Sequence, residues 1–157
     1  ALFEEGKNLA LVSDAVTPAI SDPVSALVCA IREHFGCAVP VVAVPGPSAL
    51  TAAFSVAGIS ASDFLFLGFL PHKKGRETLF KEMSESKRPV IFYESPHRVL
   101  KTLASLKARI GDRSVVILRE LTKIYEEVLD GTAEELLDRL TNDLQKQRGE
   151  FVVIVTP

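Results

Sequence analysis

Six acidic and basic side chains are grouped in two short segments, 94–98 and 119–123, of the C-terminal half of the chain. They are Glu94, His97, Arg98, Arg119, Glu120 and Lys123. Each segment follows a short apolar run, so both are expected just beyond the end of a strand. There a carboxylate can act as a general base on an alcohol, and a cation can bind a phosphate. The same residue types also suit structural ion pairs between neighbouring strands, and the pattern alone slightly favours the ion pairs.

A second group consists of closely spaced cations. Residues 72–76 form the only dense basic run of the sequence, and its basic members are His72, Lys73, Lys74 and Arg76. Such a run is able to bind phosphates, although it is equally typical of a solvated loop. The net charge of -2 and the pI of about 6.0 argue against a wide nucleic-acid-binding face. Any RNA contact is therefore expected to be a local patch.

Two polar segments of the N-terminal part, 13–18 and 45–49, also follow apolar runs. Asp14 suits a ribose diol or a substrate ammonium, and it equally suits a cap of its own loop. Ser48 and Ala49 begin a predicted helix, whose free N–H groups favour a carboxylate or a sugar oxygen. The alternative there is a plain tight turn, because the G-x-G-x-x-G pattern of dinucleotide folds is absent.

Alternating strands and helices are expected to position these segments. Apolar runs predict strands at 9–13, 41–44, 64–70, 89–93, 115–118, 125–129 and 151–155. Capping residues and apolar faces predict helices at 22–35, 48–56, 76–87, 95–110 and 132–144. This order is typical of an α/β fold, doubly wound in its first part, with ligands beyond the carboxyl ends of parallel strands. The small, polar stretch 59–63 predicts a domain boundary, which gives domains at 1–62 and 63–157.

The bulk composition supports a globular protein of the cytoplasm. The chain has 157 residues, of which 47% are hydrophobic, and this is enough apolar material for a core. No apolar run approaches the roughly 18 residues that span a bilayer, and no signal peptide is recognisable. Cys29 and Cys37 are expected to be buried thiols, and the scattered histidines predict no metal site. Residues 1–7 resemble the end of a helix that runs into a strand, so an N-terminal segment is expected to be missing.

Seven segments, in this order, resemble a known family. They are S-D-A-V-T-P at 13–18, S-D-P at 21–23, P-G-P-S-A at 45–49, G-F-L-P at 68–71, F-Y-E-S-P-H-R at 92–98, R-E-L-T-K at 119–123 and G-E-F at 149–151. With these motifs the chain closely resembles the 16S ribosomal RNA ribose methyltransferases of the tetrapyrrole methylase superfamily. The resemblance covers essentially all 157 residues.

This resemblance implies two α/β domains with S-adenosylmethionine bound in the cleft between them, the second domain having a mixed sheet. It implies methyl transfer to the ribose 2'-hydroxyl of a cytidine in 16S ribosomal RNA of the small subunit, by a cytoplasmic homodimer without a membrane contact. The cofactor contacts that it implies are Ser13, Asp14, Ala15, Val16, Thr17, Ser48, Ala49, Phe92, Tyr93, Glu94 and Leu121. Glu94, Glu120 and Lys123 are the catalytic candidates, and His72, Lys73, Lys74, Arg76 and Arg98 are the candidate RNA contacts.

Two residues depart from the family pattern. Val16 and Val24 stand where the pattern has glycine, and a β-branched side chain does not tolerate the positive φ that glycine often serves. The family's first strand and its Pro- and Gly-containing loop also have no match here. Two alternatives therefore stay open: a methylase of a tetrapyrrole, and an inactive remnant that acts as a dimerisation or RNA-binding module. The R-E-L-T-K and F-Y-E-S-P-H-R segments favour the RNA enzyme over the tetrapyrrole enzyme.

Overall fold

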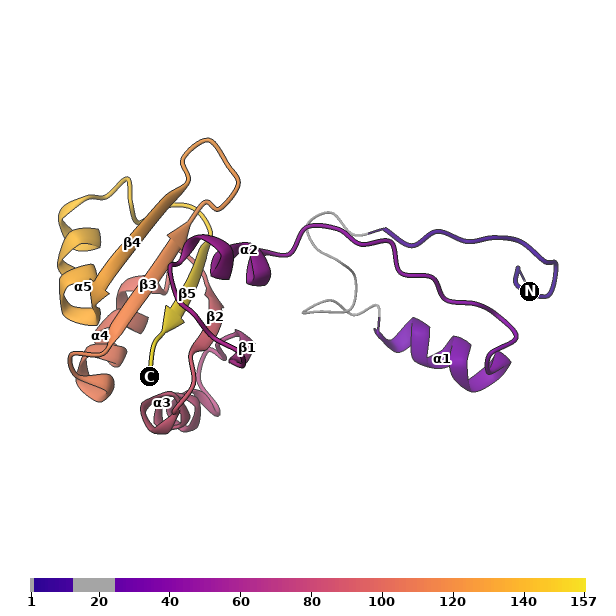
Figure 1. Ribbon diagram of the computed structural model, residues 1–157, viewed down its shortest axis with the longest axis horizontal. Coiled ribbons are helices and arrows are strands. Elements are labelled where there is room, and N and C mark those ends of the chain that lie inside the picture. The colour runs from indigo at the N-terminus through magenta and orange to yellow at the C-terminus, as the bar shows by residue number, and fades with distance from the viewer. Residues whose placement is uncertain (1, 13–24) are drawn as a thin grey trace. The chain divides into compact units, whose positions relative to one another are not determined.

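The chain consists of two units that make most of their contacts internally. The computed structural model describes residues 2–12 and 25–157, and the contacts divide the chain into Ala1–Ser48 and Ala49–Pro157 (Figure 1).

In the described residues of the first unit there are one helix and two irregular segments. Helix α1 spans Ser25–Phe35 and ends before Gly36, which has a φ of 58°. This agrees with the predicted helix end, because glycine tolerates the left-handed conformation that follows many helices. Phe3 packs edge-on against Phe35, with 5.6 Å between the ring centroids. Ile31 is the buried residue of α1.

The two strands predicted in the first unit are not formed within the described residues. Residues 7–12 and 40–48 have no strand pairing, and Val12, Val42 and Val44 are 87%, 79% and 82% exposed. An apolar run becomes a buried strand only where neighbouring strands satisfy its backbone groups. No described segment of this unit offers such an edge, so the predicted strands at 9–13 and 41–44 are wrong for these residues.

The prediction of buried thiols is also wrong. Cys29 and Cys37 are both free and exposed. Cys29 lies on α1, and its thiol is within 3.5 Å of a carboxylate oxygen of Glu33. The prediction rested on the position of Cys29 on the apolar side of the helix, and the described part of this unit has no sheet to cover that side.

The second unit is built on a five-stranded mixed sheet, which confirms the predicted mixed α/β architecture. Its strands are β1 (Leu65–Phe69), β2 (Val90–Glu94), β3 (Ser114–Arg119), β4 (Glu127–Thr132) and β5 (Phe151–Val155), in the order β1-β2-β5-β3-β4. Strand β1 is parallel to β2, β5 is antiparallel to both β2 and β3, and β4 is antiparallel to β3. Strands β1, β2 and β3 therefore run in the same direction and end at the same edge, here called the carboxyl edge.

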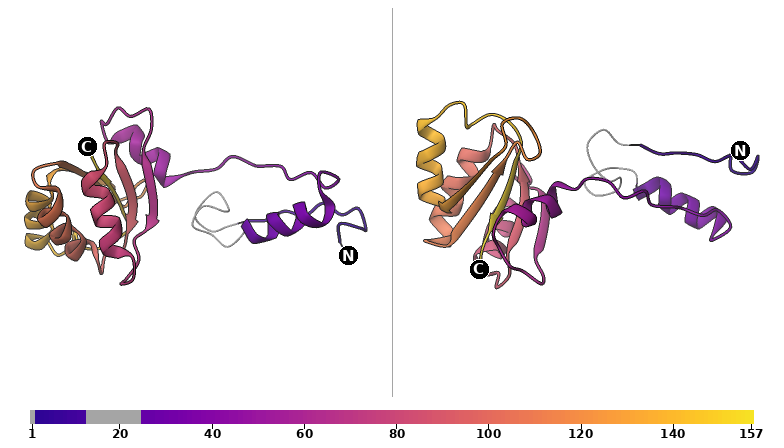
Figure 2. Two further views of the ribbon diagram at one scale, coloured as in Figure 1. Left: turned by 90° about the horizontal axis from the view of Figure 1, so that it is seen from below. Right: turned by 45° about the horizontal axis from the view of Figure 1, so that its top comes forward.

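Helices cover both faces of this sheet (Figure 2). Helices α3 (Arg76–Glu85), α4 (Val99–Ile110) and α5 (Ala133–Asn142) bury Phe80, Leu103 and Leu136 on one face, together with side chains such as Phe92 and Ile117 of the sheet. Helix α2 (Ala49–Val56) buries Ala53 on the other face. Because successive side chains of a strand point to opposite faces, each strand contributes to both layers.

Local sequence signals account for several helix ends. The capping box predicted at Thr132 is present: its hydroxyl oxygen accepts a hydrogen bond from Glu135 N at 3.2 Å, and Glu135 Oε2 accepts one from Thr132 N at 2.8 Å. Helix α5 ends at Asn142, so the predicted helix to 144 is two residues too long, and Leu144 is 72% exposed. Helix α4 begins at Val99 rather than at 95, because residues 95–98 form a hydrogen-bonded turn.

Helix α2 belongs to the second unit by its packing, since its apolar side chains cover the sheet. The contacts thus divide the chain after Ser48, whereas the sequence predicts a domain boundary after residue 62. That boundary stays a prediction about the folded domains. None of the described helices has the length and apolar character needed to cross a membrane.

Candidate functional site

The second unit brings its chemistry-bearing segments to the carboxyl edge of the sheet. Segment 94–98 begins at the last residue of β2, segment 119–123 begins at the last residue of β3, and the basic run 72–76 follows β1. Phe151, the first residue of β5, is paired with both Glu94 and Arg119, so residues 149–150 also lie at this edge. The topology therefore gathers segments that are far apart in the sequence. Ser13, Asp14, Ala15, Val16 and Thr17, predicted as cofactor contacts, and Val24 lie outside the described residues.

Glu94 is the centre of a buried ion-pair network, here called the Glu94 network. Its side chain is only 1% exposed, and both carboxylate oxygens are engaged. Oε1 accepts hydrogen bonds from Ser95 N at 2.8 Å and forms an ion pair with Arg98 at 2.8 Å. Oε2 accepts the Thr102 hydroxyl at 2.6 Å and lies 3.6 Å from Arg76. Neither oxygen is left to accept a proton from a substrate, so the geometry matches the structural ion pairs that the sequence slightly favoured.

The two arginines of the Glu94 network also hold the chain after β1. Arg98 donates to the carbonyl oxygen of Leu70 at 2.7 Å, and Arg76 donates to that of Pro71 at 3.2 Å. Arg76 also donates to the Thr102 hydroxyl at 2.6 Å. Both guanidinium groups are thus used inside the protein, whereas the sequence predicts that they contact RNA. Of the predicted phosphate contacts, His72, Lys73 and Lys74 are exposed.

Thr102 is a member of this network that sequence reasoning missed. It is 1% exposed and lies on the same side of α4 as Val99, Leu103 and Leu106. A polar residue at that helical spacing is a recognisable signal, because a buried hydroxyl needs a hydrogen-bonding partner. Only the structure identifies that partner as Glu94.

The alternation of β2 separates three residues that the sequence places in one site. Phe92 is fully buried in the layer of α3, α4 and α5, and Glu94 binds Arg76 and Thr102 in the same layer. Tyr93 lies on the opposite face, where Ala49 and Leu121 pack against the same apolar cluster. Of the predicted cofactor contacts, the structure therefore brings together Ala49, Tyr93 and Leu121, and it leaves the side chains of Phe92 and Glu94 on the other face.

Tyr93 is the centre of an aromatic cluster on the α2 face. Its ring lies 5.1 Å from Phe66 and 5.3 Å from Phe69, both in edge-on contacts. Phe69 remains 59% exposed, so the cluster is open to solvent on one side. Burial raises the pKa of the Tyr93 hydroxyl, and a hydrogen bond with the backbone of Leu50 partly opposes this. The phenol is therefore neutral near pH 7 and sits at the first turn of α2.

A second ion-pair network, here called the Glu120 network, joins segment 119–123 to the residue before β5. Lys123 Nζ lies 2.9 Å from Glu120 Oε1 and 3.0 Å from Glu150 Oε2. The backbone N–H of Glu150 donates to Glu120 Oε1 at 2.9 Å, and that of Glu120 donates to the carbonyl oxygen of Glu150 at 2.9 Å. The Lys123 side chain is 46% exposed, so this network, unlike the first, is accessible to a substrate.

The charges of the Glu120 network stabilise each other. The hydrogen bond from Lys123 lowers the pKa of the Glu120 carboxyl, and the bonds to Glu120 and Glu150 raise the pKa of the Lys123 ammonium. At neutral pH the site therefore holds an ionised carboxylate of weakened basicity beside a permanent cation. This arrangement favours a role for Lys123 as a positive charge near a reacting oxygen, with Glu120 holding it in place.

The backbone of the same segment adopts rare conformations. Glu120 and Thr122 have φ values of 51° and 66°, in the left-handed region that side-chain-bearing residues seldom occupy. Gly149 has a φ of 102°, and a Cβ atom there would lie 2.5 Å from Cγ of Glu120. Glycine in the G-E-F segment is thus required by both its backbone and the close approach of Glu120. Strained residues of this kind cluster at functional sites.

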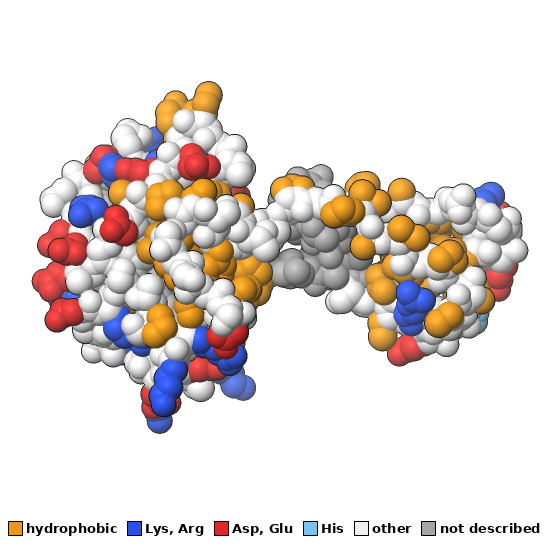
Figure 3. All heavy atoms as spheres, viewed as in Figure 1, with side chains coloured by type: hydrophobic (Ala, Val, Ile, Leu, Met, Phe, Trp, Pro, Cys, Tyr) orange, Lys and Arg blue, Asp and Glu red, His pale blue; other side chains and the backbone are white. Residues whose placement is uncertain are grey.

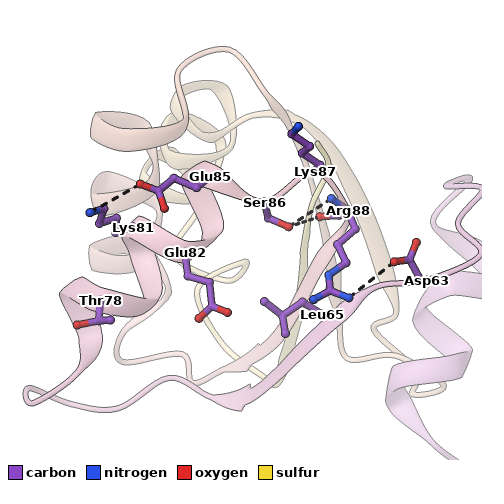
Figure 4. A pocket seen from close by; sticks show the side chains of 9 residues that line it. All are labelled: Asp63, Leu65, Thr78, Lys81, Glu82, Glu85, Ser86, Lys87 and Arg88. Atoms are coloured by element: carbon purple, nitrogen blue, oxygen red, sulfur yellow. Dashed lines mark hydrogen bonds and ion pairs between the residues drawn. The ribbon is translucent and has the colours of Figure 1, made fainter.

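Two hollows of the second unit lie at the opposite edge of the sheet. The larger, of about 700 Å³, lies beside α3 and the starts of β1 and β2, and Figure 4 shows that charges of both signs line it. Arg88 is 3.7 Å from Asp63 there, and Lys81 is 3.8 Å from Glu85. The other, of about 570 Å³, lies between the end of α2 and the start of β3. Neither contains a residue that the sequence predicts to be functional.

Comparison with known proteins identifies relatives of the chain. The family described as tetrapyrrole (corrin/porphyrin) methylases matches residues 1–137. Ribosomal RNA small subunit methyltransferase I of Xylella fastidiosa is 47% identical over 152 residues, which are 96% of this chain and 55% of the relative. The protein of the same name from Thermotoga maritima is 43% identical over 155 residues, covering 99% of this chain and 68% of the relative. In Escherichia coli O157:H7 the identity is 44% over 157 residues, 99% of this chain and 54% of the relative.

The chain thus spans about half the length of most of these curated relatives. Solved structures share its fold. The methyltransferase CobJ aligns with a TM-score of 0.67 and 21% identity, over 99% of this chain and 66% of that one. Uroporphyrin-III C-methyl transferase from Thermus thermophilus, solved with S-adenyl homocysteine, aligns with a TM-score of 0.59 and 16% identity, over 89% and 62% of the two chains. At these identities the likeness establishes the fold.

Proposed function

Because the chain belongs to the tetrapyrrole methylase family and, within it, to the ribosomal RNA small subunit methyltransferase I family, we propose that it transfers a methyl group from S-adenosylmethionine to 16S ribosomal RNA. The acceptor is the ribose 2'-hydroxyl of a cytidine in the small subunit. The single observation that carries this proposal is the identity of 42–47% with ribosomal RNA methyltransferases over nearly all of the chain. The cytoplasm as its location and a homodimer as its working form belong to the same proposal.

The aromatic cluster of the α2 face is the part of the second unit that fits the cofactor. Phe69 leaves an aromatic surface open beside Tyr93, and a purine ring stacks well on such a surface. Ala49 begins α2, and the positive end of the helix dipole there suits an oxygen of the cofactor. Ala49, Tyr93 and Leu121 are therefore the proposed contacts from this unit. The cofactor, when bound, supplies an electrophilic methyl group on a sulfonium sulfur.

The residues of the Glu120 network are the proposed catalytic group. A ribose hydroxyl is a weak nucleophile, and a cation placed beside it favours loss of its proton to solvent. Lys123 supplies this cation, and Glu120 and Glu150 fix the position of its ammonium group. Glu94 acts as a positioning residue, because Arg98 and Thr102 occupy its two oxygens. Exposed His72, Lys73 and Lys74 bind phosphates of the substrate.

A labelled-methyl assay with two acceptors tests this proposal. The chain is incubated with labelled S-adenosylmethionine and either small ribosomal subunits or uroporphyrinogen. We expect label in 16S RNA and none in the tetrapyrrole. Label in uroporphyrinogen alone would support the alternative favoured by the fold of the corrin and porphyrin methylases. Label in neither, with RNA still bound, would support the inactive RNA-binding module.

A binding measurement separates cofactor binding from catalysis. Calorimetric titration with S-adenosylmethionine is expected to give binding that Tyr93→Ala weakens by roughly 10-fold, because one aromatic contact is worth about 1.4 kcal/mol. Val16→Gly serves as the comparison for the first unit, and it is expected to leave binding unchanged or tighter. Equal affinities for the chain with and without the Tyr93 ring would contradict the proposed contact.

A further inference from the structure

Two apolar side chains stand exposed at the tip of the turn between β3 and β4. Ile124 is 91% exposed and Tyr125 is 71% exposed. Figure 3 shows hydrophobic side chains standing clear of the surface at the end of this turn. Single exposed apolar residues are common. Here two large apolar residues are adjacent at the tip of one turn, and both are mostly exposed.

Ion pairs and hydrogen bonds fix the backbone of this turn. Lys123 is tied to Glu120 and Glu150 by the network described above, so the residue directly before the tip is anchored to the start of β5. The N–H of Thr122 donates to the carboxylate of Glu126, which closes the turn across the tip. The N–H of Glu126 also donates to the carbonyl oxygen of Lys123 at 3.1 Å.

Arg119 links the turn to residues 145 and 148 through hydrogen bonds. Its guanidinium donates to the carbonyl oxygen of Tyr125 at 3.4 Å, and to those of Arg148 and Gln145 at 2.7 and 2.9 Å. Only 12% of its side chain is exposed. Together with the left-handed backbone of Glu120 and Thr122, these bonds restrain the backbone of the tip. A surface that is held rigid loses less entropy when it binds a partner.

We propose that Tyr125 is a stacking platform for an unpaired base of the RNA substrate, with Ile124 packed against the neighbouring sugar. This inference rests on the proposed function, and it assigns a part of the same site to base recognition. One exposed aromatic ring matches the size of one base, and proteins recognise unpaired RNA by such stacking. A stable protein partner would need about 800 Å² of surface from each side, far more than two side chains provide.

The position of the tip agrees with an RNA strand laid along the carboxyl edge. The basic run with Lys73 and Lys74 follows β1, and the tip follows β3. Three strand spacings separate β1 from β3 in the order β1-β2-β5-β3. At about 4.8 Å each these amount to roughly 14 Å, a span of a few nucleotides. Next to the tip, the single ammonium of Lys123 is shared by Glu120 and Glu150, and the carboxylate of Glu126 accepts from the Thr122 N–H. Carboxylates therefore outnumber the cation there, so phosphate attraction falls to the basic run and base contact to the tip.

A fluorescent RNA tests the inference. A single-stranded oligonucleotide that carries 2-aminopurine is titrated with the unaltered chain and with Tyr125→Ala, Tyr125→Phe and the control Leu144→Ala, which removes another exposed apolar side chain. We expect the unaltered chain to quench the fluorophore. Tyr125→Ala is expected to weaken binding roughly 10- to 100-fold and to abolish quenching, whereas Tyr125→Phe and the control stay within about 2-fold.

Three other outcomes would contradict the stacking inference, the proposed function or both. Equal binding and equal quenching by the unaltered chain and Tyr125→Ala would overturn the stacking inference and leave the proposed function in place. Failure of the unaltered chain to bind any RNA would overturn the proposed function, and the inference with it. If sedimentation showed a dimer that Tyr125→Ala dissociates, the tip would be a protein contact and the inference would be wrong.

Discussion

The Glu94 and Glu120 networks use the same chemistry in two different surroundings. Each joins carboxylates and cations at the carboxyl edge of one sheet, at the ends of β2 and β3, which run in the same direction on either side of β5. Glu94 is closed in by α3 and α4 and has both oxygens occupied, whereas Lys123 is 46% exposed at the end of β3. The comparison teaches that charge and position after a strand do not identify a catalytic residue. Burial and free hydrogen-bonding capacity separate the structural group from the one that we propose to be reactive.

The largest effect on stability is expected from breaking the Glu94 network. Glu94→Gln removes the negative charge that faces Arg76 and Arg98 and leaves both buried cations uncompensated. Loss of one partner of a buried pair costs about 3–5 kcal/mol, which urea unfolding monitored by circular dichroism measures. Glu85→Gln is the matched control, since Glu85 pairs with Lys81 on the exposed surface, and about 0–1 kcal/mol is expected. Similar losses for both variants would remove the distinction between the networks.

An intermediate effect is expected at Gly149, where the Glu120 network meets the chain before β5. Gly149→Ala places a Cβ 2.5 Å from Glu120 in a backbone with φ of 102°, and about 1–3 kcal/mol of destabilisation is expected. Gly58→Ala is the control, because Gly58 also has a positive φ, 68°, but no atom lies within 4 Å of the added methyl. The difference between the two free energies of unfolding isolates the crowding of Glu120. Equal free energies of unfolding for the two variants would indicate that Glu120 moves away from the added methyl group at little cost in free energy.

The strands of the two units show which parts of the fold the sequence predicts. The strands predicted from the apolar runs at 64–70, 89–93, 115–118 and 151–155 are formed in the second unit. They form because the partner strands of each run lie in the same unit. The runs at 9–13 and 41–44 have the same composition and form no strands in the described residues. A run of apolar residues indicates that burial of the segment is favourable. Which other segment buries it depends on the whole fold.

Segments of the site were predictable, and the roles of their side chains were not. The positions of 94–98 and 119–123 after strands predict that they meet at one edge, and they do. The family resemblance implies that Phe92, Tyr93 and Glu94 contact one cofactor, although alternation along β2 sends Tyr93 to the opposite face. The pairing of Glu94 with Thr102 depends on the docking of α4, which no spacing within the sequence specifies.

The smallest stability effect is expected for Glu120, and it depends on pH. The pKa of Glu120 is lowered in the folded protein, so its contribution is present above the unfolded value near 4.5 and is lost as the pH falls through the folded pKa. Glu120→Gln should therefore lower stability by less than about 1 kcal/mol at pH 7, because the pair lies at the surface. In unfolding measured from pH 7 to pH 3, the variant should approach the unaltered chain at the acid end. A constant difference at every pH would contradict this.

The most direct test of the contrast between the two networks is the rate of methyl transfer by Lys123→Met, measured as labelled 2'-O-methylcytidine recovered from 16S RNA of small ribosomal subunits. We expect a rate at least about 100-fold below that of the unaltered chain, with the free energy of unfolding changed by less than about 1 kcal/mol. A variant that keeps the full rate would contradict the role of the Glu120 network in catalysis. A variant that loses activity only because it unfolds would place Lys123 with Glu94, among the residues that hold the structure.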